Sequence, residues 1–399
     1  MPLPLHYMSA KSSSLMHHAQ RLFLFVAALL VSVAASAADN NSLPIPSAPS
    51  LGAKSYILVD YNSGQVLAAK NPDKRIEPAS ITKLMTCYIV FDEIKKGNLK
   101  PSDMVTVSKK AWEIHGSQMF LKVGDKVSVD DLLQGLITQS GNDAAVALAQ
   151  YIAGTTSTFA DYMNQYAKQL GMTNSHFMDV NGLPHPDHYM SARDIATLYA
   201  AIVRKFPKLY DQYFHEKSFT YAGIKQYNRN TLLWSDPRVD GGKTGHTESA
   251  GYNLAASAKD HGMRVIAVVT GTNSENARKS QCEALISYGF RFFDDGKLFD
   301  KGKEISQIRV WKGAESELPV VADGPVYVAY PRGQRDSLST SAKLPSHLTA
   351  PIKKGERLGT LLIKYNDKTL KEEPLYAGKS IAEGGYVTQF IDDILMMFQ

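Results

Sequence analysis

A serine and a lysine three residues apart are the first pair in this 399-residue sequence whose types and spacing could do chemistry. Ser80 and Lys83 stand at the start of the apolar stretch EPASITKLMTCYIVFDEI, which is typical of a helix. Residues i and i+3 lie on one face of a helix, so the two side chains can touch. A serine hydroxyl is a weak nucleophile until a base takes its proton, and burial lowers the pKa of a lysine towards that task. The pair therefore predicts a nucleophile and its base, although the same spacing also occurs by chance beside an exposed lysine.

Two later segments carry polar residues that suit the same kind of site. QSGND places Ser140 and Asn142 between two segments with helical spacing, where a hydroxyl and an amide can face one cleft. VDGGKTGHT places Lys243, Thr244 and Gly245 at the entry to a pair of strands. A cation, a hydroxyl and a backbone open to close approach suit a substrate carboxylate and its adjoining peptide.

The order of the expected elements predicts an α+β domain. Residues 55–71 contain two apolar runs around an Asn-Ser-Gly turn at 62–64, which indicates a hairpin. Residues 108–217 are mostly helical in spacing, residues 252–272 form two more strands, and residues 274–293 form a closing helix. The pattern therefore favours a sheet assembled from both ends of the segment, with a helical block inserted between them.

The composition changes beyond this domain. Residues 294–380 consist of short alternating runs punctuated by Gly, Pro and Asp, which predicts a small all-β domain. In residues 384–399 the apolar side chains recur at helical spacing, with Asp392 and Asp393 on the opposite face, which predicts an amphipathic helix. We expect its apolar face to dock on a membrane interface or on the protein's own core.

The first 37 residues predict a cleaved export signal. Arg21 precedes an apolar run at residues 22–33 that is short for a membrane span, and Ala35-Ser36-Ala37 fits the small-x-small cleavage rule. An uncleaved anchor is the alternative. Residues 38–54 are rich in Pro and Ser and are interpreted as a linker that leads into the first domain.

Charge and cysteine content exclude two classes of protein. Removing the export signal takes away Lys11 and Arg21 and no acid, so the net charge falls from +5 to +3, which excludes the basic excess of a nucleic-acid-binding protein. The two cysteines, Cys87 and Cys282, are too few for a disulfide framework. Cys87 falls inside the apolar helix and is interpreted as a small buried side chain rather than a bridge or a nucleophile.

Ser-x-x-Lys, Ser-x-Asn and Lys-Thr-Gly, in this order, are the motif set of penicillin-binding proteins and class A β-lactamases. From about residue 55 to its end the sequence resembles the low-molecular-mass penicillin-binding proteins, the serine D-alanyl-D-alanine carboxypeptidases of the penicillin-binding protein five type. The resemblance extends through NGL, SARD, NRN, GYNLAASA and GFRFF, and through YPRG and LTAPIKKGERLGTL in the β domain. It implies a β-lactamase/transpeptidase-like catalytic domain at residues 55–293, followed by the β domain and a helix that attaches to the membrane.

The resemblance also implies a role for each matched residue. Ser80 would attack the carbonyl of the penultimate D-alanine and form an acyl-enzyme, and Lys83 would accept its proton. Ser140 would pass a proton to the departing D-alanine, while Asn142 would hold the substrate amide and the lysine. A β-lactam mimics the D-Ala-D-Ala end and would acylate Ser80 as well.

Residues 243–246 would bind the end of the substrate. By the same resemblance, Lys243 and Thr244 would hold the terminal carboxylate, and Gly245 would let the strand approach the substrate closely. The backbone N–H groups of His246 and Ser80 would form the oxyanion hole. The substrates implied are the stem peptides of peptidoglycan, and the location implied is the periplasm, on the outer face of the inner membrane.

The sequence favours a carboxypeptidase over three other functions. A β-lactamase is disfavoured because no Glu-x-x-Leu-Asn motif lies between the Ser140 and Lys243 motifs. A D,D-endopeptidase would use the same residues, but the family's endopeptidases generally lack the β domain. A non-catalytic envelope scaffold would have no need of Ser80, Lys83, Ser140 and Lys243 together.

Three features leave smaller questions open. His185 and His188 have i, i+3 spacing, but the sequence places no third ligand beside them, so we expect a polar loop near the rim of the cleft and no metal or cofactor. Arg229 in NRN either holds the substrate or braces the cleft. The terminal helix lacks basic residues beyond Lys379, so electrostatic attraction to an anionic membrane would not assist it.

Overall fold

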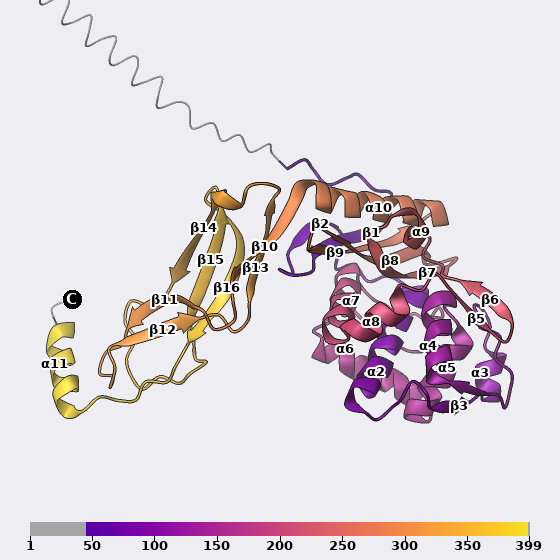
Figure 1. Ribbon diagram of the computed structural model, residues 1–399, viewed down its shortest axis with the longest axis horizontal. Helices are drawn as coiled ribbons and strands as arrows, with labels where there is room; N and C mark the ends of the chain where they lie inside the picture. Colours follow the sequence, from indigo (N-terminus) through magenta and orange to yellow (C-terminus); the bar gives the residue numbers. More distant parts are fainter. Residues whose placement is uncertain (1–44, 398–399) are drawn as a thin grey trace, which may run out of the picture. The chain divides into compact units, whose positions relative to one another are not determined.

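The computed structural model describes residues 45–397, so the predicted export signal lies outside the described residues. The first domain contains a five-stranded antiparallel sheet in the order β2-β1-β9-β8-β7 (Figure 1). Its strands are β1 Ser55–Asp60, β2 Val66–Lys70, β7 Val239–Thr247, β8 Gly251–Asp260 and β9 Met263–Thr272. The predicted hairpin and the predicted later strand pair are therefore confirmed, and the sheet does join both ends of the segment.

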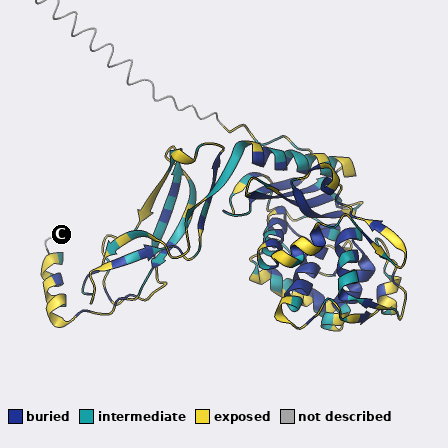
Figure 2. Ribbon diagram, in the orientation of Figure 1, coloured by how far each residue is buried: buried dark blue, intermediate teal, exposed yellow. Residues whose placement is uncertain are grey.

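The sheet is buried on both faces because its strands are apolar at successive positions. In β9, Ile266 and Val268 pack into the core shared with the helical block. Val265 and Val269 point the other way and pack with helix α10 (Glu275–Phe292), which lies along the opposite face (Figure 1). Figure 2 shows β1, β7, β8 and β9 mostly buried, whereas the edge strand β2 is largely exposed. Strand β7 forms one edge of this sheet, and β2 forms the other.

The helical block lies between β2 and β7. Two of its helices, α2 and α5, are buried along most of their length and contact each other at the centre of the block. Their first residues are Lys83 and Asn142, two of the predicted functional residues, so dense packing fixes these two in place. The elements are η1 Ala79–Thr82, α2 Lys83–Lys96, β3 Met104–Thr106, α3 Lys109–Glu113, β4 Lys126–Ser128, α4 Val129–Gln134, η2 Gly135–Gln139, α5 Asn142–Ala153, α6 Thr156–Gln169, α7 Ala192–Lys205, α8 Pro207–Phe214, β5 Ser218–Tyr221, β6 Ile224–Tyr227 and α9 Leu232–Ser235.

The second domain is all-β, as predicted from its alternating pattern. Its larger sheet has the order β11-β12-β16-β15-β14, and β10 pairs with β13 in a two-stranded sheet. Side chains such as Val320, Val328 and Ile363 fill its separate core. Its strands are β10 Phe293–Phe299, β11 Glu304–Arg309, β12 Glu317–Val321, β13 Val326–Pro331, β14 Leu338–Lys343, β15 Arg357–Tyr365 and β16 Lys368–Ala377, and a 3₁₀ turn, η3 Arg335–Ser337, precedes β14.

The predicted terminal helix is present as α11, Tyr386–Met396. Its polar face is the buried one: Asp392 is 8% exposed and its Oδ2 accepts a hydrogen bond from the Lys312 backbone N–H at 2.5 Å. Asp393 forms an ion pair with the Lys312 side chain. The apolar side chains point to solvent, with Phe390 67% exposed. Among the described residues, no helix combines the length and the apolar character needed to cross a bilayer.

Candidate active site

Ser80 and Lys83 meet where a 3₁₀ turn runs into a helix. Ser80 lies in η1 and is partly exposed, and Lys83 is the first residue of α2 and is 1% exposed. The Lys83 Nζ lies 2.8 Å from the Ser80 Oγ. The contact predicted from the spacing is therefore confirmed, and the lysine is buried rather than solvated.

The amine of Lys83 is held by three oxygen acceptors in a place that water does not reach. Besides Ser80, the Nζ donates to Asn142 Oδ1 at 2.7 Å and to the Asn181 carbonyl at 3.0 Å. Burial lowers the pKa of Lys83 to about 7, with Asp179 opposing this change and Arg229 adding to it. A base with a pKa near the working pH combines a neutral fraction with a useful affinity for the proton.

Ser140 and Asn142 stand at the break between two helical segments, as predicted. The π-helical turn η2 ends at Gln139, and the next residue, Ser140, has a φ of 66°, which is left-handed and strained for a residue with a side chain. Helix α5 starts two residues later, and the Asn142 Nδ2 donates to the His115 carbonyl at 2.6 Å. That bond orients the amide so that its oxygen faces Lys83.

Lys243 forms the second hydrogen-bonded pair of the site. It is 3% exposed on β7, and its Nζ donates to the Ser140 Oγ at 2.7 Å. Burial and the neighbouring positive charges hold the pKa of Lys243 well below its ordinary range. Those charges belong to Lys83, Arg229 and Arg278. This concentration of positive charge favours the binding of an anion such as a carboxylate.

Strand β7 passes so close to η1 that it needs a glycine. A Cβ on Gly245 would lie 2.6 Å from the Pro78 carbonyl oxygen, which is shorter than real contacts allow. The Asn253 Nδ2 also donates to the Pro78 carbonyl at 3.3 Å, which ties β8 to the same turn. His246 is exposed and stacks on Tyr252 with ring centroids 3.9 Å apart.

The structure brings the eight residues selected from the sequence to neighbouring elements. One hydrogen-bonded group, on η1, α2 and α5, consists of Ser80, Lys83 and Asn142. A second group, which joins the end of η2 to β7, consists of Ser140 and Lys243. The last three residues follow Lys243 along β7 where this strand contacts η1, and they are Thr244, Gly245 and His246.

Sequence reasoning missed three contributors. Asn181 acts through its backbone carbonyl, which no side-chain motif can reveal, although the NGL segment around it matched the family. Asp179 and Arg278 act through charge on the two lysines from elements distant in sequence. The spacing of residues gives no signal for such long-range effects.

Arg229 contacts the turn before Ser140, and the two cysteines are buried free thiols. The Arg229 Nε donates to the Gln139 carbonyl at 3.1 Å, so the residue braces the turn before Ser140, while its charge also acts on both lysines. Cys87 and Cys282 are free and buried, and burial raises the pKa of both thiols. Cys87 is therefore the small buried side chain expected.

The expectation for the histidine loop is wrong for His188. His185 is exposed, but His188 is 2% exposed, and its Nε2 lies 2.8 Å from the Thr82 Oγ1. The ring contacts the buried Thr82 hydroxyl, and its Nδ1 lies 3.4 Å from the half-buried carboxylate of Asp179. Within the part of the chain that the structure describes, no group of three or more His, Cys, Asp or Glu residues could hold a metal ion.

Comparison with known proteins agrees with this geometry. Residues 43–274 match the model of a family described as D-alanyl-D-alanine carboxypeptidase, and residues 293–383 match the C-terminal domain of penicillin-binding protein 5. The chain is 41% identical to the D-alanyl-D-alanine carboxypeptidase DacA of Escherichia coli K12 over 389 residues, covering 95% of this chain and 96% of that one. It is 45% identical to DacC of the same organism over 359 residues, covering 88% and 90%.

Solved structures show the same relationship. Penicillin-binding protein 5 from Haemophilus influenzae superposes with a TM-score of 0.82 at 40% identity, covering 85% of this chain and all of the other. A mutant of the Streptomyces K15 DD-transpeptidase covers 61% of this chain and 99% of its own, with a TM-score of 0.58 at 29% identity. The resemblance inferred from the motifs is therefore confirmed, and the chain belongs to the D-alanyl-D-alanine carboxypeptidase family of penicillin-binding proteins.

Proposed function

We propose that this serine-type carboxypeptidase removes the terminal D-alanine from peptidoglycan pentapeptides through an acyl-enzyme on Ser80. The observation that carries the proposal is the buried amine of Lys83, 2.8 Å from the Ser80 Oγ, with a pKa lowered to about 7. At neutral pH a fraction of this amine is free of its proton and can accept the one on the hydroxyl.

In the first step the Ser80 Oγ attacks the carbonyl carbon of the penultimate D-alanine. The hydroxyl proton passes to the Lys83 Nζ, and the carbonyl oxygen becomes an oxyanion. The backbone N–H groups of Ser80 and His246 are the donors that would stabilise it, each contributing about 3 kcal/mol. The closeness of β7 to η1, which Gly245 permits, brings these two backbones together.

In the second step the C–N bond breaks and D-alanine leaves. Its nitrogen takes a proton from the Ser140 hydroxyl, which recovers one from Lys83. The hydrogen bond from Lys243 to the Ser140 Oγ orients that hydroxyl. Lys243 and Thr244 hold the carboxylate of the leaving residue, and this carboxylate offsets the crowding of positive charge around Lys243. Water then attacks the acyl-enzyme and releases the shortened peptide.

The chain also binds β-lactams. The ring amide of a β-lactam occupies the place of the D-Ala-D-Ala peptide bond, so Ser80 opens the ring and becomes acylated. The leaving nitrogen stays attached to the acyl group because the ring joins the two. This gives an assay of Ser80 chemistry that does not depend on peptide specificity.

Export to the periplasm and peripheral attachment to the inner membrane complete the proposal. The sequence of residues 1–37 supports export. The exposed apolar face of α11 supports attachment, because ion pairs on the opposite face hold the helix against its own domain with the apolar side outward. Since its described charged residues are the two acids on that opposite face, we expect attachment by apolar burial and little effect of salt.

The experiment that tests the activity is the release of D-alanine from a peptide ending in Lys-D-Ala-D-Ala. The chain without its export signal is compared with its Ser80→Ala variant. Release by the parent alone supports both the reaction and the nucleophile. No release by a folded parent that still cleaves dimeric cross-linked muropeptides would replace the carboxypeptidase with an endopeptidase.

A further inference from the structure

A buried histidine contacts the turn of the nucleophile, and no step of the mechanism uses it. The His188 Nδ1 accepts a hydrogen bond from the Met178 backbone N–H at 3.3 Å. On the other side of the ring, Nε2 lies 2.8 Å from the Thr82 Oγ1, within hydrogen-bond distance. The ring also meets Phe177 edge-on, with centroids 5.7 Å apart. Because Thr82 lies between Ser80 and Lys83, the histidine is one hydrogen bond away from the catalytic turn.

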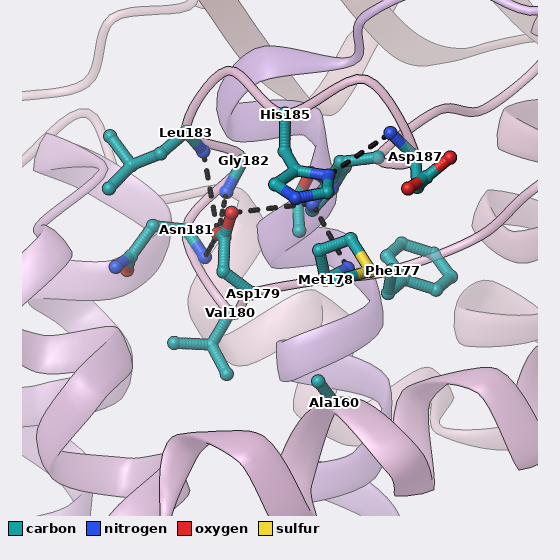
Figure 3. Close-up of polar contacts among 12 residues, drawn as sticks. Ala160, Phe177, Met178, Asp179, Val180, Asn181, Gly182, Leu183, His185 and Asp187 are labelled. Carbon is teal, nitrogen blue, oxygen red and sulfur yellow. Dashed lines mark hydrogen bonds and ion pairs between the residues drawn. The ribbon is translucent and has the colours of Figure 1, made fainter.

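Asp179 organises the turn on the other side of the same lysine. Its Oδ1 accepts backbone N–H groups from Asn181 and Gly182, both at 2.7 Å, and from Leu183 at 3.4 Å (Figure 3). These three bonds hold residues 179–183 in one shape. The carbonyl of Asn181 is thereby presented to the Lys83 Nζ at 3.0 Å.

Two contacts link the turn and the histidine into one unit. The Asp179 Oδ2 lies 3.4 Å from the His188 Nδ1. Gly182, with a φ of 83°, packs so closely on the turn of the nucleophile that a Cβ there would lie 1.8 Å from the Ala79 carbonyl oxygen and 2.6 Å from the Thr82 Oγ1. His188 and the 179–183 turn therefore both contact the short segment from Ala79 to Thr82, and they lie beside each other.

We propose that His188 and Asp179 form a positioning pair for the acylation step, which holds Thr82 and the Asn181 carbonyl so that the Lys83 amine stays aligned with the Ser80 hydroxyl. Neither residue touches the reacting atoms. The pair acts through the hydrogen bond to Thr82 and through the shape of the 179–183 turn. The inference rests on the proposed function in one respect, namely that Lys83 is the base.

The pair also sets the charge around the base. The acidic groups that act on Lys83 are Asp179 and Asp143, and the positive ones are Arg229 and Lys243. Asp179 is the strongest of the charges and raises the pKa of Lys83 against the effect of burial. A change of Asp179 to Asn keeps an oxygen for the turn and removes the charge. It should therefore move the acid limb of the acylation rate to lower pH.

The test measures the second-order rate of acylation by a fluorescent penicillin, with thermal unfolding of each variant as a check on folding. For His188→Ala we expect a rate about 10 to 100 times lower, because small displacements of reacting groups cost this much. His188→Gln should recover most of the rate, since its amide can hydrogen-bond to the Thr82 hydroxyl. His185→Ala is the matched control: it removes an exposed histidine of the same loop, and we expect a change within about twofold.

The outcomes separate the inference from the proposed function. A folded His188→Ala variant that reacts at the parent rate overturns the inference, as does an equal loss in the Ala and Gln variants. If His188→Ala does not fold, the Asp179→Asn variant provides the test. The inference is also overturned if the acylation rate of this variant has the same acid limb and the same plateau as that of the parent. If Lys83→Ala does not react but the His188 and Asp179 variants react like the parent, only this inference is wrong. If Lys83→Ala reacts at the parent rate, the proposed mechanism is wrong, because Lys83 is then not the base.

Discussion

Helices α2 and α11 depart from the usual pattern of burial in opposite directions. Helix α2 buries a lysine at its first residue, and α11 buries an aspartate while its apolar side chains face solvent. Buried charge and exposed apolar surface are the informative exceptions in a folded protein. In α2 the exception makes a base, and in α11 it makes a surface ready to contact another apolar phase.

The two exceptions are stabilised by different means. Lys83 has an oxygen acceptor for each of its three possible N–H donors, and its lowered pKa reduces the charge that must be buried. Asp392 is held by the Lys312 backbone N–H and lies 3.5 Å from the Arg309 guanidinium. The arrangement around Lys83 depends on the fold of the whole catalytic domain. The arrangement around Asp392 depends on a few contacts at the edge of the β domain.

The largest effect on the acylation rate is expected when Lys83 is replaced by a residue that always carries its charge. Lys83→Arg keeps a cation at this position, but a guanidinium does not lose its proton at any ordinary pH. Loss of general-base catalysis lowers rates by about 10² to 10⁴-fold, so we expect acylation by a fluorescent penicillin to fall by that much. Lys95→Arg on the same helix, where the lysine is exposed, should react like the parent. An active Lys83→Arg variant would show that Lys83 serves as a charge and not as a base.

The pH dependence of acylation also tests whether Lys83 acts as a base. Burial lowers the pKa of Lys83 to about 7, and the reaction needs the neutral amine, so the rate should fall as the pH drops below 7. At pH 5 only about 1% of the amine would be neutral, which predicts a rate about 100-fold below the plateau. Stopped-flow acylation between pH 5 and 9 measures this limb. A rate that is flat down to pH 5 would contradict a base with this pKa.

Local features of the site could be predicted from the sequence, and long-range ones could not. The contact between Ser80 and Lys83 follows from helix geometry, and the break that presents Ser140 follows from the two helical patterns around it. The strands on either side of the inserted helices were predictable from their apolar runs. In each case the signal lies within about ten residues of the feature.

The parts that were missed depend on tertiary contacts. The burial of His188 results from its meeting with Thr82, 106 positions earlier in the chain, and the acceptor on Asn181 is a backbone atom. The sequence showed that α11 is amphipathic, but which face would pack inward depended on Lys312 and Arg309 in the β domain. Periodicity identifies the two faces of a helix without stating what each one meets.

The exposed face of α11 gives a third test, with an intermediate effect. Phe390→Glu places a charge on that face, where the side chain is 67% exposed, so the fold should tolerate it. Keeping one phenylalanine side chain out of the bilayer costs about 2 to 3 kcal/mol, so binding to phospholipid vesicles should weaken about 30 to 150-fold. Thr388→Glu is the matched control, because it adds the same charge two residues away, outside the apolar face. Equal binding by the parent and both variants would remove α11 as the attachment site.

The smallest effect is expected from the contact that holds α11 in place. Asp392→Ala removes the acceptor for the Lys312 N–H and the ionic contact with Arg309. Hydrogen bonds to charged groups are worth about 1.5 to 3 kcal/mol, so the fraction of molecules with α11 released should rise about 10-fold or more. Hydrogen exchange of the α11 amides, or proteolysis near Gly384, measures that fraction. Acylation of Ser80 should not change, because α11 belongs to the other domain.

Vesicle binding by this last variant tells whether docking and attachment are separate functions of the helix. The apolar face is intact in Asp392→Ala, so attachment driven by apolar burial should persist even when the helix is released from its domain. Binding that falls with docking would mean that the β domain must present the helix in a fixed orientation. In that case α11 and Lys83 would have one property in common. The apolar face of α11 would bind the membrane, as Lys83 acts as a base, only when the surrounding fold holds it in position.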